Sequence, residues 1–238
     1  MRILAALFFV VVAGLPSTIR AQDTPDPPTG VREFTTSGTW RVPSNVSRIT
    51  VELWGGGGGG AGGASGLAGS GGPGGGGGAG GSGAYVRANV PVKPGEIYSI
   101  TVGAPGTGGR GESRDGAQPG GDGGDTTLSL DRTVLLVARG GMGGGAPKRA
   151  HHRGGVAGSG GTAKVNRSTL VREGNSGTSG HDGGFSEWTS TSGGRGGHAV
   201  LGTVRPPASF GGDGGDGMGF GYAEDGRAGG AGSAIITW

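Results

Sequence analysis

The stretch Gly57-Gly-Gly-Gly-Ala-Gly-Gly-Ala-Ser-Gly-Leu-Ala-Gly-Ser-Gly-Gly-Pro-Gly-Gly-Gly-Gly-Gly-Ala-Gly-Gly81 carries glycine at every third position without a break. A period of three matches neither the α-helix nor the β-strand, but it matches the polyproline II helix. That helix has no internal hydrogen bonds, so its backbone groups point outward. Because glycine has no side chain, neighbouring helices can approach closely enough to bond to one another. The stretch therefore predicts one rod of an ordered bundle.

Shorter runs of the same period occur later in the chain, separated by stretches in which the period is broken. Their registers begin at Gly155, Gly174, Gly211 and Gly226. The chain holds 65 glycines and 13 prolines in 238 residues, which is typical of disorder when it has no period. Disorder does not explain the repeated registers, and collagen requires one long register with abundant proline. We therefore favour antiparallel polyproline II helices joined by loops.

Apolar alternation indicates β-strands on both sides of the glycine-rich stretch. In Ser47–Trp54 the side chains of Ile49, Val51 and Leu53 share one face. Earlier β structure is expected between Val31 and the start of this run. Further strands are expected at Ala84–Val90, Ile97–Val102, Thr126–Leu130, Thr133–Ala138 and Ala234–Trp238.

The expected fold class is therefore mainly β and non-regular. We expect a small β-sandwich-like platform that bears the bundle of glycine-rich polyproline II helices. Essentially no α-helix is expected in the mature chain, because no window carries a helical apolar stripe free of glycine.

The N-terminus resembles a secretory signal peptide. Arg2 precedes the apolar run Ile3–Leu15, and a cleavage region ends at Ala21. The run is shorter than the roughly 20 residues that span a bilayer, and an uncleaved N-terminal anchor is the alternative. We expect a signal peptide at 1–21, a Pro-rich linker at 22–30 and a glycine-rich domain at 31–238. The mature protein is then secreted, periplasmic or on the cell surface, without a transmembrane segment.

Charge gives no indication of a nucleic-acid partner. The formal net charge of +3 includes Arg2 and Arg20, so the mature chain is close to neutral. One dense basic cluster holds Lys148, Arg149 and Arg153. It is a candidate anion-binding site for a glycan or phosphate, although a solvated loop is the favoured interpretation.

Several framing motifs resemble a known family. They are Phe34–Pro43, Ile49–Trp54 followed by Gly55–Gly60, Pro94–Gly103, Gly120–Leu128 and Gly229–Trp238. Together they resemble the glycine-rich domain of phage tail-fibre tip adhesins and of related secreted bacterial glycine-rich proteins. The resemblance implies a β platform that bears a polyproline II bundle, with distal loops that contact surface receptors. The signal peptide favours a bacterial secreted or surface protein over a phage one.

No arrangement of residues predicts catalysis or a cofactor. Glycine patterns of the dinucleotide-binding type occur by chance and open no helix, and no carboxylate pair or nucleophile stands in a catalytic context. The four histidines lack zinc spacing. Gly211–Gly219 fits a calcium-binding nonapeptide, which makes Asp213 and Asp216 weak calcium candidates. Such repeats need tandem copies, so carboxylates that face solvent are the favoured reading.

The remaining candidates are aromatic residues between the glycine runs, together with one arginine. These speculative ligand-binding residues are Phe185, Trp188, Arg205, Phe210, Phe220 and Tyr222. Exposed rings stack on sugars or anchor partners, although they serve equally well to cap the bundle ends. The expected function is a non-enzymatic binding or adhesion module for a cell-surface glycan or surface protein. The alternatives are a structural or extracellular-matrix protein and, with less support, calcium binding or ice binding.

Overall fold

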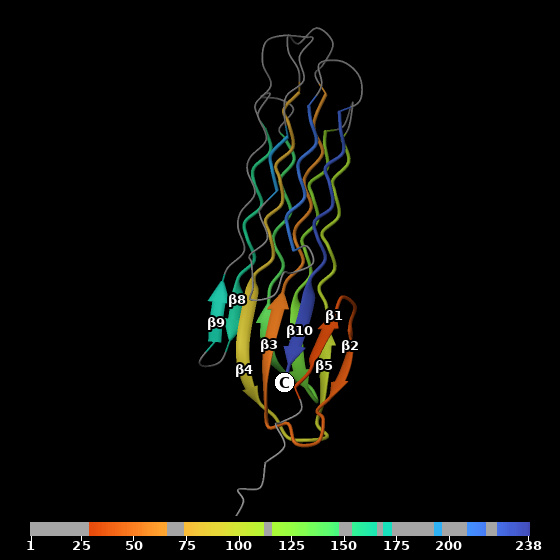
Figure 1. Ribbon diagram of the computed structural model, residues 1–238. Helices are drawn as coiled ribbons and strands as arrows, with labels where there is room; N and C mark the ends of the chain where they lie inside the picture. The colour runs from red at the N-terminus through yellow and green to blue at the C-terminus, as the bar shows by residue number, and fades with distance from the viewer. Residues whose placement is uncertain are drawn as a thin grey trace, which may run out of the picture.

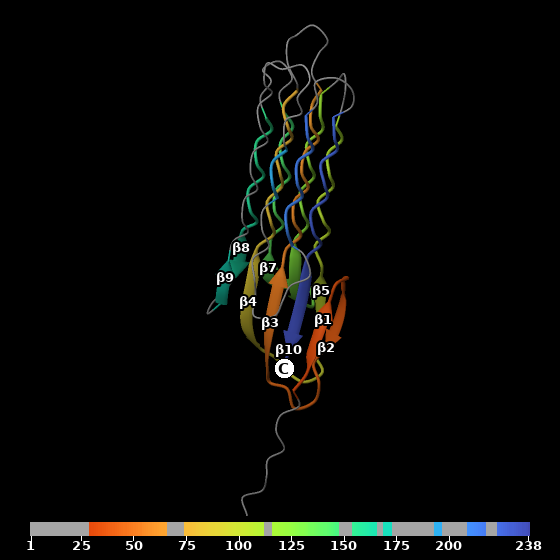
Figure 2. The ribbon, with the colours of Figure 1, turned by 45° about the horizontal axis from the view of Figure 1, so that its top comes forward.

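The computed structural model describes residues 29–65, 74–111, 116–147, 154–165, 169–172, 193–196, 209–217 and 223–238. Within these ranges the chain forms ten β-strands and no helix. The strands gather at one end of the molecule, and the glycine-rich segments run side by side away from them (Figures 1 and 2). The mainly β fold with a β platform is therefore confirmed for the described residues.

The strands form two antiparallel sheets of five strands each. The first sheet has the order β1-β10-β3-β4-β9 and the second has the order β2-β5-β6-β7-β8. The first sheet consists of β1 (Val31–Phe34), β10 (Ser233–Thr237), β3 (Arg48–Trp54), β4 (Tyr85–Pro91) and β9 (Thr169–Arg172). The second consists of β2 (Gly38–Arg41), β5 (Ile97–Thr101), β6 (Thr126–Leu130), β7 (Thr133–Ala138) and β8 (Ala163–Val165).

Every strand expected from alternation is present, within two residues of its expected ends. The strands β8 and β9 were not expected, because three and four residues are too few to display a period of two. Their positions matter for the platform. They pair with β7 and β4 respectively, so each lies at the edge of its sheet on the same side of the platform.

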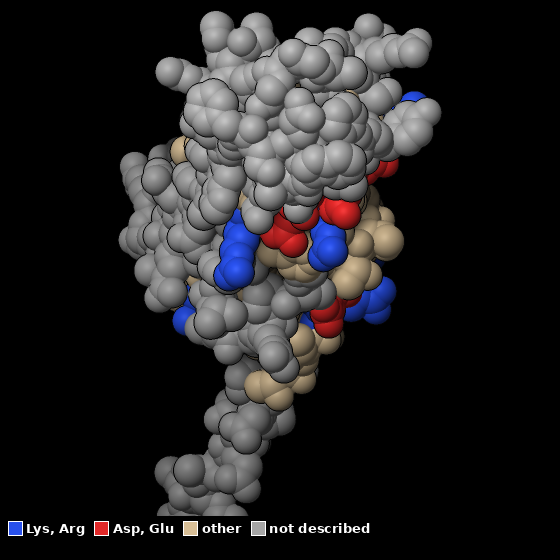
Figure 3. Space-filling view, turned by 90° about the horizontal axis from the view of Figure 1, so that it is seen from above, with Lys and Arg blue, Asp and Glu red and all other residues tan. Residues whose placement is uncertain are grey.

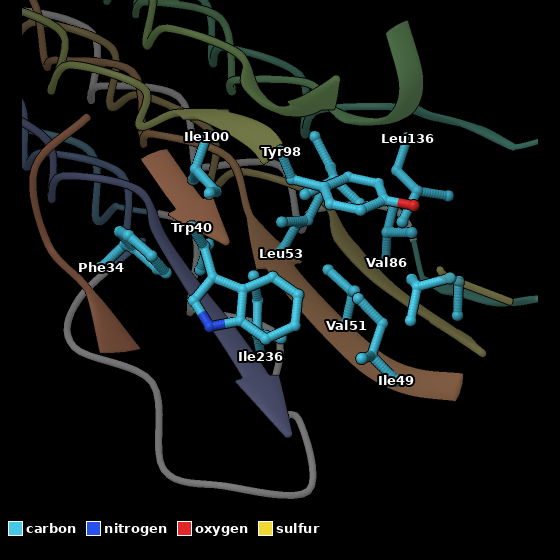
Figure 4. Packing of buried hydrophobic residues seen from close by; sticks show 14 of the residues in the cluster. Phe34, Trp40, Ile49, Val51, Leu53, Val86, Tyr98, Ile100, Leu136 and Ile236 are labelled. Atoms are coloured by element: carbon cyan, nitrogen blue, oxygen red, sulfur yellow. The ribbon is translucent and has the colours of Figure 1, made fainter. Parts of the chain in front are cut away.

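The main hydrophobic core fills the space between the two sheets. The predicted inward face of β3, with Ile49, Val51 and Leu53, is buried there (Figure 4). Trp40 on β2 lies 5.3 Å from the ring of Trp238, measured between ring centroids. The aromatic side chains of the first half of the chain and of its C-terminus thus serve the platform.

The opposite face of β3 is also buried near its end. Trp54, Tyr85 and Ile235 form a second apolar cluster, and Glu52 beside them is 3 % exposed. The hydroxyl of Tyr85 donates a hydrogen bond to the Glu52 carboxylate. The alternation in β3 therefore predicts correctly which residues face the main core. The opposite face, however, is buried at this end of the strand and does not face solvent.

Residues 55–64, here called the central segment, donate hydrogen bonds in three directions in turn. Every third N–H group serves the same neighbour, with N···O distances of 2.8–3.0 Å. Gly55, Gly58, Ala61 and Ala64 donate to residues 75–84. Gly56, Gly59 and Gly62 donate to residues 118–124, and Gly57, Gly60 and Gly63 donate to residues 224–230.

The carbonyl groups of the central segment serve three further neighbours. They accept hydrogen bonds from the segment at 139–145, from that at 103–111 and from that at 209–217. Six glycine-rich segments among the described residues therefore surround the central one. A side chain has no room there: a Cβ added at Gly60 would lie 1.9 Å from the carbonyl oxygen of Asp213.

The stretch Gly57–Gly81 is not one rod, which corrects the expectation from its unbroken period. Residues 55–65 and 74–84 are two antiparallel segments, joined by hydrogen bonds such as Gly58 N–H to the carbonyl of Gly81. Both segments are buried, so both need glycine. The period of three in the sequence continues across residues 66–73, so it does not reveal where one segment ends and the next begins. The registers from Gly155, Gly211 and Gly226 each lie in one segment, and that from Gly174 lies outside the described residues.

Most of the predicted N-terminal segments lie outside the described residues. These comprise the signal peptide at 1–21 and the linker at 22–30 up to residue 28. Among the residues that are described, no helix is long and apolar enough to cross a membrane.

Candidate functional site

A shallow groove of about 270 Å³ lies on the side of the bundle, between three glycine-rich segments. Its walls come from residues 193–196, 209–217 and 223–232. The residues that line it are Gly196, Phe210, Gly211, Gly212, Asp213, Arg227 and Ala228. Glycine forms most of the floor, so the three larger side chains determine its chemistry.

Phe210 supplies an exposed aromatic ring to this groove. The residue is 46 % exposed, so part of its ring is accessible to a ligand. Its carbonyl oxygen accepts a hydrogen bond from the N–H group of Gly230. This bond fixes the backbone of the ring-bearing residue against the next segment.

Asp213 and Arg227 place opposite charges beside that ring. One Arg227 guanidinium nitrogen lies 3.7 Å from Oδ2 of Asp213, and both side chains are largely exposed. Their backbones are also joined, because the N–H group of Arg227 donates to the carbonyl of Asp213 at 2.8 Å. The groove therefore combines an aromatic face, a carboxylate and a guanidinium on backbones that are fixed to each other.

The groove lies near the platform end of the bundle. Ser209, which precedes Phe210, accepts a hydrogen bond from Gly83, two residues before the start of β4. Asp216, at the other end of the same segment, lies beside Gly63. The prediction grouped Phe210 with loops at the distal end, and the structure separates it from that end. The sequence does not reveal the direction in which each segment runs, so this position could not be foreseen.

The aspartates of the calcium-like motif have a structural role in the bundle. Oδ1 of Asp213 accepts the N–H of Gly196 at 2.8 Å, and Oδ1 of Asp216 accepts the N–H of Gly193 at 2.7 Å. The motif Gly-Gly-Asp-Gly-Gly-Asp of residues 211–216 also occurs at residues 120–125. There, Asp122 and Asp125 accept from Gly143 and Gly140.

Calcium binding therefore stays a prediction. One oxygen of each carboxylate already accepts a hydrogen bond from a glycine N–H, and this bond competes with binding of a metal ion. The described part of the chain contains no group of three or more histidine, aspartate or glutamate side chains that could hold a metal ion. The recurrence of Gly-Gly-Asp-Gly-Gly-Asp was visible in the sequence. It is the signal from which a lateral hydrogen-bonding role could have been inferred.

The other predicted site residues lie outside the described residues. They are Phe185, Trp188, Arg205, Phe220 and Tyr222, and the basic cluster Lys148, Arg149 and Arg153. Viewed from the distal end, acidic and basic side chains lie next to each other on the described flank of the bundle (Figure 3). The surface charge of this described flank is therefore mixed and of neither sign alone.

A β-sandwich that carries a laterally hydrogen-bonded bundle of glycine-rich segments defines a scaffold rather than an activity. Residues 33–238 match the family described as the glycine-rich domain, and the chain belongs to this family. A comparison with curated proteins gave no match.

Proposed function

We propose that this chain is a secreted, non-enzymatic binding or adhesion module whose bundle consists of polyproline II helices. The hydrogen bonds of the central segment support the helix type. Successive N–H groups point to three different neighbours and return to the first after three residues, as three residues per turn require. None of these bonds joins residues of the same segment, and polyproline II likewise has no internal hydrogen bonds.

The observation that carries the binding function is the exposed ring of Phe210 in a groove beside the Asp213–Arg227 pair. Aromatic faces pack on the apolar faces of sugar rings, and carboxylate and guanidinium groups bond their hydroxyls. A cell-surface glycan fits this combination better than an anionic polymer, because the two charges cancel. The fixed backbones of the three segments favour binding without rearrangement.

The distal end of the bundle is the second part of the proposed binding surface. The described chain reaches that end at Ser65 and Gly217 and resumes at Gly74 and Ala223. The predicted ligand residue Trp188 belongs to the undescribed stretches of the chain. In this proposal the groove binds saccharide, and the connections between segments add selectivity for a glycan or surface protein.

A glycan array probed with the mature chain tests the proposal. We expect binding to a restricted set of glycans. The double variant Phe210→Ala/Arg227→Ala should lose at least about tenfold in affinity, because it removes a stacking and hydrogen-bonding anchor. Val156→Ala is the matched control, since Val156 is 69 % exposed on another segment. Trp188→Ala tests this predicted ligand residue separately from the groove.

Two results would contradict the proposal: absence of binding to every glycan, or wild-type affinity of both the groove variant and Trp188→Ala. A structural or matrix role is the second candidate. It is favoured by Asp213, which already bonds to Gly196 of its own bundle and pairs with Arg227. In that case the array stays blank, while Asp213→Ala, which removes the acceptor of the Gly196 N–H, still lowers the stability of the bundle.

A further inference from the structure

One side of the platform is closed over only part of its length. The edge strand β9 pairs with β4 at Tyr85–Ala88, and the edge strand β8 pairs with β7 at Leu136–Ala138. However, β4 continues to Pro91, and β7 begins at Thr133. Among the described residues, the two sheets therefore extend beyond the strands that close this side.

A cavity of about 560 Å³ lies at this opening. Both sheets contribute apolar side chains to its wall: Val90, Val92, Tyr98, Leu130, Leu135 and Leu136. Val92, Tyr98 and Leu136 are buried, whereas Val90, Leu130 and Leu135 are half-buried and pack against the main core. The ring of Tyr98 points towards Leu136 (Figure 4).

This volume is within the range of pockets that bind small organic molecules. Because side chains of two sheets face each other across the cavity, their backbones hold it open without a ligand. Apolar walls that remain in contact with water favour an occupant that covers them.

The polar groups at the rim carry no net charge. Lys93 and Glu96 lie there with opposite charges, and Oε2 of Glu96 accepts hydrogen bonds from the Lys93 backbone N–H and the Tyr98 hydroxyl. Burial, reinforced by the Glu96 hydrogen bond and charge, raises the pKa of Tyr98 to about 12, so its hydroxyl stays protonated at physiological pH. Among the described residues that line the cavity, the charges of Lys93 and Glu96 cancel in sum, so the rim gives no net attraction to a charged ligand.

We propose that this cavity is a binding site for an uncharged, largely hydrocarbon small molecule. Its apolar body lies between Val90, Leu130 and Leu135, and any polar end faces the Lys93–Glu96 rim. The site is distinct from the groove at Phe210, because it lies between the sheets of the platform and not on the bundle. The platform thus carries a ligand site of its own besides supporting the bundle.

Titration of the full mature chain with Nile red, an uncharged apolar dye, tests this inference. We expect a saturable rise in fluorescence with one site per chain. The anionic dye anilinonaphthalene sulfonate should bind more weakly. Leu135→Glu should weaken Nile red binding about tenfold or more, because an unpaired carboxylate in the cavity has no partner. Val134→Glu is the matched control on the same strand, since Val134 is 55 % exposed and does not line the cavity.

Val90→Trp tests the same site without adding a charge. The larger ring occupies the cavity, so we expect binding to fall while the thermal melt stays cooperative. The inference is overturned if the wild-type chain shows no saturable binding. It is also overturned if folded Leu135→Glu and Val90→Trp bind as wild type does, or if Val134→Glu loses as much affinity as Leu135→Glu.

Discussion

The carboxylate of Asp213 accepts a hydrogen bond from the backbone N–H of Gly196 at 2.8 Å. Asp216, three residues later, bonds Gly193 in the same way. Backbone groups three residues apart face the same neighbouring segment in this bundle. The two aspartates are also three residues apart, so both carboxylates reach the same neighbour, residues 193–196. A side chain thus takes the place of a neighbour's carbonyl oxygen at the surface of the bundle.

Replacing Asp213 and Asp216 by alanine should destabilise the protein. Each substitution leaves a glycine N–H without its acceptor, which costs about 1 kcal/mol per site. Asparagine keeps an acceptor oxygen, so Asp213→Asn/Asp216→Asn should recover most of the loss. Thermal melts followed by circular dichroism measure both variants. Equal melting temperatures for the alanine and asparagine pairs would contradict a role as acceptors.

A methyl group in the central segment should be far more damaging than one in the platform. In Gly60→Ala the new Cβ would meet the Asp213 carbonyl oxygen at 1.9 Å, and a backbone atom cannot rotate away. The cost should reach or exceed the roughly 1–3 kcal/mol that is typical of overpacking. In Gly38→Ala, the matched control, the nearest atom is a Phe34 ring carbon at 3.6 Å. Urea denaturation compares the two, and similar midpoints would refute the close packing.

Alkaline pH should destabilise the platform through Tyr98. Burial raises the pKa of Tyr98 to about 12 from an ordinary value of 10.0, with further contributions from Glu96. Since the folded state holds the proton more tightly than the unfolded state, this contribution is fully present below about pH 10. It is lost progressively as the pH rises towards about 12.

Absorbance of the phenolate in wild type and in Tyr98→Phe measures this effect. The variant should lack the tyrosine titration step near pH 12 that belongs to Tyr98. Its stability should also fall less between these two pH values than that of the wild type. A wild-type protein whose tyrosines all titrate near the ordinary value would exclude the raised pKa.

Truncation of Trp238 should loosen the side of the platform that carries the edge strands β1 and β2. Its ring lies 5.3 Å from that of Trp40, and its backbone exchanges two hydrogen bonds with Gly30. Trp238→Ala should cost about 2 kcal/mol, less than for a fully buried ring because Trp238 is half-buried. Trp238→Phe keeps an aromatic contact and serves as the control. Near-ultraviolet circular dichroism should change with Trp238→Ala, and an unchanged spectrum would indicate that the contact is unimportant.

The platform was largely predictable, because alternation in β3 and in the segments up to β7 reports which face is buried. β8 and β9 were not, since their place depends on pairing with distant strands and not on local pattern. The bundle was predictable as a class from its period of three. The division of Gly57–Gly81 was not, because both antiparallel segments require glycine and the register hides the turn.

The candidate sites were less accessible to sequence reasoning. Phe210 was identified as a candidate, but its position near the platform depends on the direction of its segment. The aspartates were identified too, but they were expected to face solvent, with calcium binding as a weak alternative, and their lateral hydrogen bonds were not foreseen. The cavity beside Leu135 arises where two edge strands end, and no residue pattern marks such an ending.

The donors of the central segment have acceptors throughout the later chain, and Gly57 bonds to Gly230 close to the C-terminus. During synthesis on a ribosome, residues 55–64 emerge before all of these acceptors, and several of the acceptors emerge close to the end of the chain. Contacts between residues so far apart in sequence form slowly, because the intervening chain must first be closed into a loop. The central segment is thus the first glycine-rich part of the protein to be synthesised and among the last to reach its native state.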